Sequence, residues 1–156
     1  MHEKLKNIKW YHLAIAAVII LFSPMIFLFV KPAVSMNIIA IPVDRPSLDA
    51  PISPVFSRCQ YFIFYDLKRN EATYIVNQYL NTNHEVGMHV THLVMREKAG
   101  IVIARTIGPE PFEHLTARGV EIYKSAAFSV RSAIMQYKTN LLERTNKPTG
   151  FFKQFF

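Results

Sequence analysis

The chain has 156 residues, of which 51% are hydrophobic and 19% are charged, and its net charge is +7. This length suits one modest domain with an appendage. The single cysteine, Cys59, excludes an intrachain disulfide, a CxxC redox motif and a cluster held only by cysteines of one chain. The basic residues are spread over many predicted elements and form no known nucleic-acid-binding module, so we expect no nucleic-acid partner.

An uncharged apolar segment, residues 13–30, follows a basic segment at residues 1–12. As a helix it would span about 27 Å, close to the roughly 30 Å hydrocarbon core of a bilayer. Trp10 and Tyr11 precede it, where amphipathic rings favour the membrane interface. We therefore predict one transmembrane helix at 13–30, with membrane lipid as a partner. A signal peptide cleaved near the small residues 33–35 is the alternative.

Basic residues flank the predicted span unequally. Lys4, Lys6 and Lys9 precede it, and only Lys31 follows closely. Because positive flanks usually stay in the cytoplasm, the sequence predicts a cytoplasmic amino terminus. A short linker, residues 31–36, would then lead to a domain, residues 37–145, in a periplasm or an organelle lumen. The surplus of positive charge would favour anionic headgroups nearby.

The domain combines predicted strands and helices along the chain. Runs of apolar, often β-branched residues predict strands at 36–43, 61–67, 73–79, 101–107 and 120–123. Apolar residues at helical spacing predict helices at 88–98, 110–118 and 129–143, the last capped by Ser129. The order predicts an α/β domain with one mixed sheet of about five strands and helices on its faces.

The carboxyl-terminal segment, residues 146–156, is an aromatic tail with the sequence FFKQFF at its end. Docking on the domain, insertion into the membrane interface and contact with a partner all remain open. The interfacial contact is the sharpest of these hypotheses.

Three of the six histidines, His84, His89 and His92, lie close together with Met88. His89 and His92 are three residues apart, so a helix would present both rings on one face. Imidazole and thioether groups are ligands for transition metals. The segment therefore predicts a metal site made of these four residues. The spacing HxxxxHxxH matches no standard motif, so a solvated helix with chance histidines is the alternative.

Four fragments in fixed order point to a family. They read NIIAIPVD (37–44), SPVFSRCQYFIFYD (53–66), IVIARTIGPEPFEHL (101–115) and GVEIYKSA (119–126). Their order and spacing resemble the dinitrogenase iron-molybdenum cofactor biosynthesis domain, the NifX-like family of small carriers and scaffolds for metalloclusters. The resemblance implies a ribonuclease-H-like fold. It also implies non-enzymatic binding of a transition metal, such as iron, or of an iron-sulfur-type cluster.

The resemblance further implies where a cluster is bound. In the family, the loop that leads into the first helix of the domain is expected to contact the cluster. At the corresponding positions this chain has Glu85 and Gly87, beside His84 and His89. These residues are therefore predicted contacts and ligands.

The early loop departs from the family pattern, which reads S-P-H-F-G-R. Val55 stands at the histidine and Ser57 at the glycine, whereas Phe56 and Arg58 are kept. The resemblance therefore implies that Arg58 contacts the cofactor. Cys59 follows, and it would supply a thiolate ligand if Arg58 lowered its pKa. A small buried core cysteine is the alternative.

The turn 106–109 leads from a predicted strand into a predicted helix. Backbone amides near Gly108 are expected to hold an anionic group or a cluster face, although a purely structural turn is the alternative. It lacks the GxxxxGKS/T pattern of a nucleotide loop. Asp44 and Asp49 suggest a two-metal nuclease. No further carboxylates join them, so ordinary turn aspartates are the stronger interpretation.

The sequence therefore predicts a membrane-anchored, non-enzymatic carrier for a metal ion or metallocluster. Its partners would be a cluster acceptor or another protein of a membrane complex, and self-association is left open. The alternative is a structural or interaction module that kept the fold and lost the cluster, and Val55 and Ser57 motivate it.

Overall fold

The computed structural model describes residues 34–82 and 85–150. These described residues belong to one compact unit. The predicted membrane span at 13–30, residues 83–84 and the last six residues of the aromatic tail lie outside the described part. Within the described part, no helix is long and apolar enough to cross a bilayer.

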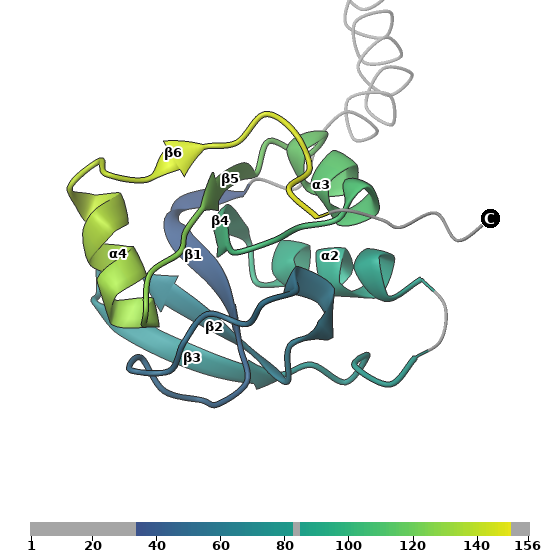
Figure 1. Cartoon of the computed structure of the whole chain (residues 1–156), viewed down its shortest axis with the longest axis horizontal. Coiled ribbons are helices and arrows are strands. Elements are labelled where there is room, and N and C mark those ends of the chain that lie inside the picture. The colour runs from purple at the N-terminus through teal and green to yellow at the C-terminus, as the bar shows by residue number, and fades with distance from the viewer. Residues whose placement is uncertain (1–33, 83–84, 151–156) are drawn as a thin grey trace, which may run out of the picture. The chain divides into compact units, whose positions relative to one another are not determined.

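In the described residues, six strands form one mixed sheet in the order β3-β2-β1-β4-β5-β6 (Figure 1). The strands are β1 (Ser35–Val43), β2 (Tyr61–Asp66), β3 (Glu71–Val76), β4 (Ala99–Ala104), β5 (Glu121–Lys124) and β6 (Glu143–Arg144). β1, β4 and β5 are parallel to one another, whereas β2, β3 and β6 run antiparallel to their neighbours. The predicted α/β domain with one mixed sheet is confirmed, with six strands rather than about five.

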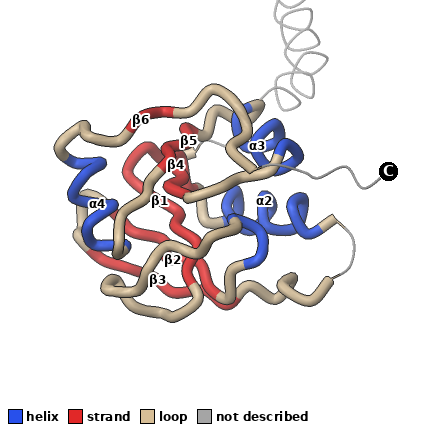
Figure 2. The backbone as a smooth tube through the Cα atoms, in the orientation of Figure 1, coloured by secondary structure: helices blue, strands red, loops and turns tan. Residues whose placement is uncertain are grey.

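Helices cover both faces of this sheet (Figure 2). They are α2 (Val86–Arg96), α3 (Pro109–Thr116) and α4 (Val130–Lys138), with a short 3-10 helix, η1 (Phe56–Arg58). α2, α3 and η1 share one hydrophobic core with the sheet, whereas α4 and the loop after β1 share the other. The described domain therefore has three layers, and of its described helices only α4 lies on the second side of the sheet.

The central strands supply both cores. Along β1, Ile39 and Ile41 enter the core under α4, while Ala40 enters the core under α2 and α3. This alternation follows from the period of two along a strand. All six residues of β4 are buried, which explains why its sequence reads as a continuous apolar run.

The last helix differs from its prediction. Ser129 is its N-cap as expected, and its Oγ accepts a hydrogen bond from the Ser132 backbone N–H at 3.2 Å. The helix ends at Lys138 rather than at 143, because Asn140 adopts a positive φ of 56°. Leu141 continues the apolar spacing that predicts a helix to 143, but it lies beyond the helix and is 75% exposed. The chain then turns back as β6, where Arg144 pairs with Tyr123 of β5.

Candidate functional site

A pocket of about 540 Å³ lies beyond the carboxyl end of β4, where η1 and the first turns of α2 and α3 meet. We call it the η1–α2–α3 pocket. Its walls are formed by residues 55, 57–58, 85–87, 106, 108, 110–111 and 149–150. Its volume falls within the range of about 300–1,000 Å³ that is typical of ligand pockets. Clefts beyond the carboxyl ends of strands are common binding places in α/β folds.

Four of the five residues predicted to contact a cofactor line this pocket. They are Arg58, Glu85, Gly87 and Gly108. They come from three separate segments of the sequence, and the fold brings them together. Their role in binding stays a prediction, but the structure does bring all four to the η1–α2–α3 pocket.

Gly87 allows α2 and α3 to approach closely. A Cβ atom added at Gly87 would lie 2.5 Å from Glu110 Oε2 and 3.0 Å from Pro111 Cδ. The Glu110 carboxylate therefore lies against the first turn of α2, where the positive end of the helix dipole favours negative charge. The predicted importance of Gly87 thus has a steric reason.

The first turn of α3 offers few donors to an anion. Gly108 is its N-cap and no side chain caps this end. Pro109 and Pro111 have no backbone N–H, so Glu110 alone supplies one among the first three helical positions. The expectation that amides of this turn bind an anion is therefore weaker than the sequence suggested.

Phe56 fixes the η1 wall of the pocket. Its ring is fully buried and packs edge-to-face on Phe62, with 5.3 Å between ring centroids. Its backbone N–H donates to the Thr106 carbonyl at 3.1 Å, and Thr106 Oγ1 donates to the Pro54 carbonyl at 2.5 Å. These bonds tie η1 to the loop between β4 and α3.

Arg58 connects η1 to the loop that precedes α2. Its Nη1 donates to the carbonyls of Leu80 and Thr82, at 3.0 Å and 3.3 Å. Each carbonyl lies only a few residues before Glu85 in the chain. Arg58 therefore orients one wall of the pocket as well as lining it.

Thr149 and Gly150 form a wall that the sequence analysis missed. The backbone N–H groups of both donate to the Ile107 carbonyl, at 3.0 Å and 2.9 Å, and the Ile107 N–H donates to Thr149 Oγ1 at 3.1 Å. Thr149 is 42 residues from Ile107 in the chain. No local pattern predicts this contact, because it is a long-range pairing of two loops. Glu110 also lines the pocket and was not predicted, although it directly follows the predicted turn at 106–109.

The predicted metal ligands on α2 do not line the pocket. The His89 ring is half-buried and stacks on Tyr79, with 4.6 Å between centroids and 9° between planes, whereas His92 is exposed. Met88 is half-buried. In residues 34–82 and 85–150, no group of three His, Cys, Asp or Glu side chains could hold a metal ion. His84 lies outside these residues, so the four-residue metal site stays a prediction.

Cys59 lies in the core rather than at the pocket. Its side chain is fully buried and Sγ donates to the Phe56 carbonyl at 3.4 Å. Burial, reinforced by the nearby Asp44 carboxylate, raises the pKa of the Cys59 thiol to about 12. Arg58 does not lower this pKa, since its guanidinium binds the loop carbonyls instead. A buried thiol that stays neutral at neutral pH does not act as a thiolate ligand. The structure therefore supports the alternative interpretation, in which Cys59 is a small residue of the hydrophobic core.

The burial of Cys59 predicts that its thiol reacts slowly with thiol reagents in the folded protein. At pH 8 a thiol-specific disulfide reagent should modify folded Cys59 about a hundredfold more slowly than Cys59 in urea-unfolded chain, because both access and thiolate fraction fall. Because the pKa is raised on folding, its contribution to stability is present below pH 9 and is lost as the pH rises toward 12. Equal reaction rates in folded and unfolded chain would show that Cys59 is an accessible thiolate.

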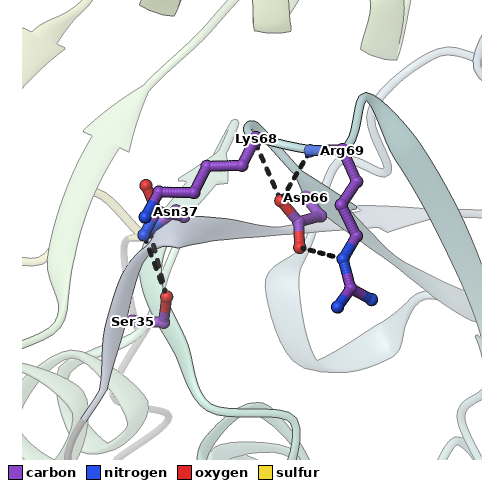
Figure 3. Close-up of polar contacts among 5 residues, drawn as sticks. All are labelled: Ser35, Asn37, Asp66, Lys68 and Arg69. Carbon is purple, nitrogen blue, oxygen red and sulfur yellow. Dashed lines mark hydrogen bonds and ion pairs between the residues drawn. The ribbon is translucent and has the colours of Figure 1, made fainter.

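The aspartates outside the pocket act in turns and in ion pairs. Asp66 Oδ1 accepts hydrogen bonds from the backbone N–H groups of Lys68 and Arg69, at 2.8 Å and 3.1 Å (Figure 3). These bonds hold the pKa of Asp66 below its usual range, and the bond from the Arg69 N–H has the larger effect. Asp49 pairs with Arg131 at 2.9 Å. Among the residues that the structure describes, no three His, Cys, Asp or Glu side chains could hold a metal ion, which agrees with the turn interpretation rather than a two-metal nuclease.

A protein-family profile matches most of the described domain. The family profile described as dinitrogenase iron-molybdenum cofactor matches residues 37–140. This range runs from the third residue of β1 to just beyond α4, and it includes every pocket residue except Thr149 and Gly150. No curated protein matches the sequence.

Several solved structures share the fold. The apo form of the orange protein from Desulfovibrio gigas has a TM-score of 0.73 and 24% identity, over 76% of this chain and 100% of that one. A putative NifB protein from Thermotoga has a TM-score of 0.64 and 28% identity, over 76% and 99%. A putative dinitrogenase from Methanocaldococcus jannaschii has a TM-score of 0.55 and 22% identity, over 73% and 100%.

Proposed function

Because the chain belongs to the dinitrogenase iron-molybdenum cofactor family, we propose that it is a non-enzymatic carrier that binds a metal ion or an iron-sulfur-type cluster in the η1–α2–α3 pocket. The family suggests a metallocluster-binding domain. The observation that supports this pocket as the place is the convergence of Arg58, Glu85, Gly87 and Gly108 on one hollow of about 540 Å³.

The chemistry of the walls suits a cargo that is held loosely. Glu85 and Glu110 offer carboxylate ligands to iron, and Arg58 offers N–H donors to an anionic group on a cluster. The lining residues that the structure describes include no Cys, His or Met. His84 directly precedes Glu85 and is the nearest imidazole in sequence. Few strong ligands mean ready release, which is what transfer to an acceptor requires.

A pair of tryptophan variants tests the pocket. Val55 is 47% exposed and lies at the pocket, and Val76 is 57% exposed on the edge strand β3. Val55→Trp should weaken retention of an iron–sulfur cluster about tenfold or more, because the indole occupies the cargo volume. Val76→Trp adds the same bulk elsewhere and should have no effect.

The measurement is iron and sulfide content, with a visible-absorption titration, of the full chain in mild detergent after anaerobic assembly from ferrous iron and sulfide. Retention by wild type and Val76→Trp but not by Val55→Trp supports the proposal. Equal retention of iron by wild type and both variants, or retention by none of the three proteins, contradicts the proposal.

The second candidate function is a structural or interaction module without cargo. It is favoured by Val55, which lines the pocket where the family pattern has a histidine, and by the absence of imidazole and thiol groups among the described lining residues. Failure of the wild-type chain to retain iron in the experiment above would favour this candidate.

We also propose that residues 13–30 anchor the chain, with the domain on the far side of the membrane from the cytoplasm. The apolar length of this segment and its basic flank of Lys4, Lys6 and Lys9 support the proposal. In a protease-protection assay, the domain should be digested from the non-cytoplasmic side while the anchor remains attached. Digestion from the cytoplasmic side, or a mature amino terminus near Ser35, would contradict it.

A further inference from the structure

Arg105 directly follows β4, and its guanidinium is poorly paired. Its Nε atom is buried and has no hydrogen-bond partner. Its Nη2 donates to the Ala127 carbonyl over a long distance of 3.4 Å, and among the described residues Arg105 forms no ion pair. Buried donors of charged groups are nearly always hydrogen-bonded, because leaving one unpaired costs free energy. Arg105 therefore keeps N–H groups that can bind an anionic group.

The backbone on both sides of Arg105 is fixed by neighbouring loops. The Ala104 carbonyl, just before it, accepts a hydrogen bond from the Ser125 N–H at 3.0 Å. Thr106 Oγ1, just after it, donates to the Pro54 carbonyl at 2.5 Å. β4 and β5 are parallel neighbours, so the loops that follow them meet at the carboxyl edge of the sheet (Figure 1). The guanidinium is thus presented from an ordered loop at the edge where α/β folds commonly bind partners and ligands.

The carboxylates in the loops and first helical turns at this edge form no ion pair with Arg105. They are Asp44, Asp49, Glu85 and Glu110. Asp49 pairs with Arg131 instead, at 2.9 Å. The two glutamates line the η1–α2–α3 pocket, where Arg58 is the neighbouring cation. The Arg105 guanidinium therefore remains available to a carboxylate of another molecule.

An exposed aromatic residue adjoins the carbonyl that Arg105 binds. Phe128 directly follows Ala127, and 91% of its surface is exposed. The loop that carries it is anchored on both sides, because Ala127 is buried and the Val130 N–H donates to the Ala50 carbonyl at 3.0 Å. Arginine and aromatic side chains are enriched in protein–protein interfaces. Arg105 and Phe128 together therefore have the composition of an interface.

We propose that Arg105 and Phe128 form a docking surface for an acidic protein segment, in which a carboxylate binds the guanidinium and an apolar side chain packs on the phenyl ring. A protein is favoured over a membrane because anionic headgroups are bound by clusters of about four to eight cations, whereas this surface has one arginine with a buried, directional donor.

The surface adjoins the cargo pocket, since Thr106, the residue after Arg105, lines the η1–α2–α3 pocket. We assign the docked segment to the protein that accepts the cargo. This assignment rests on the proposed carrier function, whereas the docking itself rests only on Arg105 and Phe128.

The docking is tested on the cargo-free full chain in mild detergent. ¹⁵N-labelled protein is titrated with a probe peptide, acetyl-Asp-Phe-Asp-Phe amide, and the Arg105 Nε–Hε signal and the Ala127 and Phe128 amide signals are followed. All three signals should shift and saturate. Arg105→Met and Phe128→Ser should each weaken binding about tenfold or more, because each removes one of two anchors. Arg69→Gln, in the exposed hairpin at the opposite edge of the sheet, should bind like wild type.

Four results overturn the docking. They are the lack of any saturable shift, an equal response to the uncharged probe acetyl-Asn-Phe-Asn-Phe amide, an equal response to inorganic phosphate, and shifts that need anionic lipid vesicles but no peptide. The second shows that the carboxylate is not recognised, the third indicates a site for a free anion, and the fourth indicates a membrane contact.

A stability measurement tests the unpaired guanidinium itself. Arg105→Met keeps an unbranched stem and removes the charge. Its urea midpoint should equal or exceed that of wild type, because the buried donor that it removes has no partner. A lower midpoint would show that the guanidinium is satisfied within the fold and would overturn the proposal.

The acceptor assignment is tested after the iron–sulfur assembly described above. By calorimetric titration, the cluster-loaded chain should bind the probe peptide within about twofold of the cargo-free chain, because Arg105 is not among the pocket residues. Loss of peptide binding on loading overturns the assignment. Peptide binding by a chain that retains no iron supports the docking and contradicts the carrier function, whereas iron retention without peptide binding does the reverse.

Discussion

Phe56→Ala should lower the free energy of unfolding by about 3–5 kcal/mol, the usual cost of deleting a fully buried aromatic ring. Phe56 has no exposed surface and packs edge-to-face on Phe62 in the core under α2 and α3. It also anchors η1, so the variant should loosen the pocket wall that carries Ser57 and Arg58. Chemical denaturation of the full chain followed by circular dichroism measures the loss.

Phe128→Ala is the matched control for Phe56→Ala. Phe128 is 91% exposed, so its replacement should change the free energy of unfolding by no more than about 0.5 kcal/mol. Similar losses for the two variants would mean that η1 is not packed as the structure shows.

Gly100→Val should lower the free energy of unfolding by about 3 kcal/mol, at the upper end of the cost of overpacking. A Cβ atom at Gly100 would lie 2.6 Å from the Ser35 carbonyl oxygen and 2.9 Å from Met36 Sδ. The first of these neighbours is backbone, so β1 and β4 would have to separate. The pairing of these strands is already irregular between Ser35 and Ile39.

Thr73→Val is the control for this second prediction, because it also places a valine in a strand. Thr73 is exposed on the edge strand β3, and valine is a β-branched residue of similar size that suits a strand. Its effect should stay within about 0.5 kcal/mol. Denaturation curves of both variants give the comparison, and an unchanged stability of Gly100→Val would contradict the close approach of β1 to β4.

The strands and the family could be predicted from the sequence because their signals are local. The apolar run of β4 reads as a strand buried on both faces, and the structure places it at the centre of the sheet. The end of α4 could not be predicted in this way. Its apolar spacing continues to Leu141, but the positive φ at Asn140 ends the helix and sends the chain into β6.

The candidate site was predictable only in part, for a similar reason. Glu85, Gly87 and Gly108 stand next to helix starts, which sequence patterns reveal. Thr149 and Gly150 reach the pocket through long-range hydrogen bonds that leave no pattern. Histidine spacing on α2 likewise does not tell which face is covered. Val90 and Val94 face the core, while His92 is exposed.

The most direct test of the carrier proposal is to locate the bound cargo by paramagnetic broadening. A ¹⁵N-labelled full chain in mild detergent is compared before and after anaerobic assembly of an iron–sulfur cluster. The proposal predicts that the amide signals of Ser57, Gly87 and Gly108 are lost, while that of Ala133 in α4 is kept. Loss centred on His92 with Gly108 unaffected, or no loss at all, would contradict binding in the η1–α2–α3 pocket.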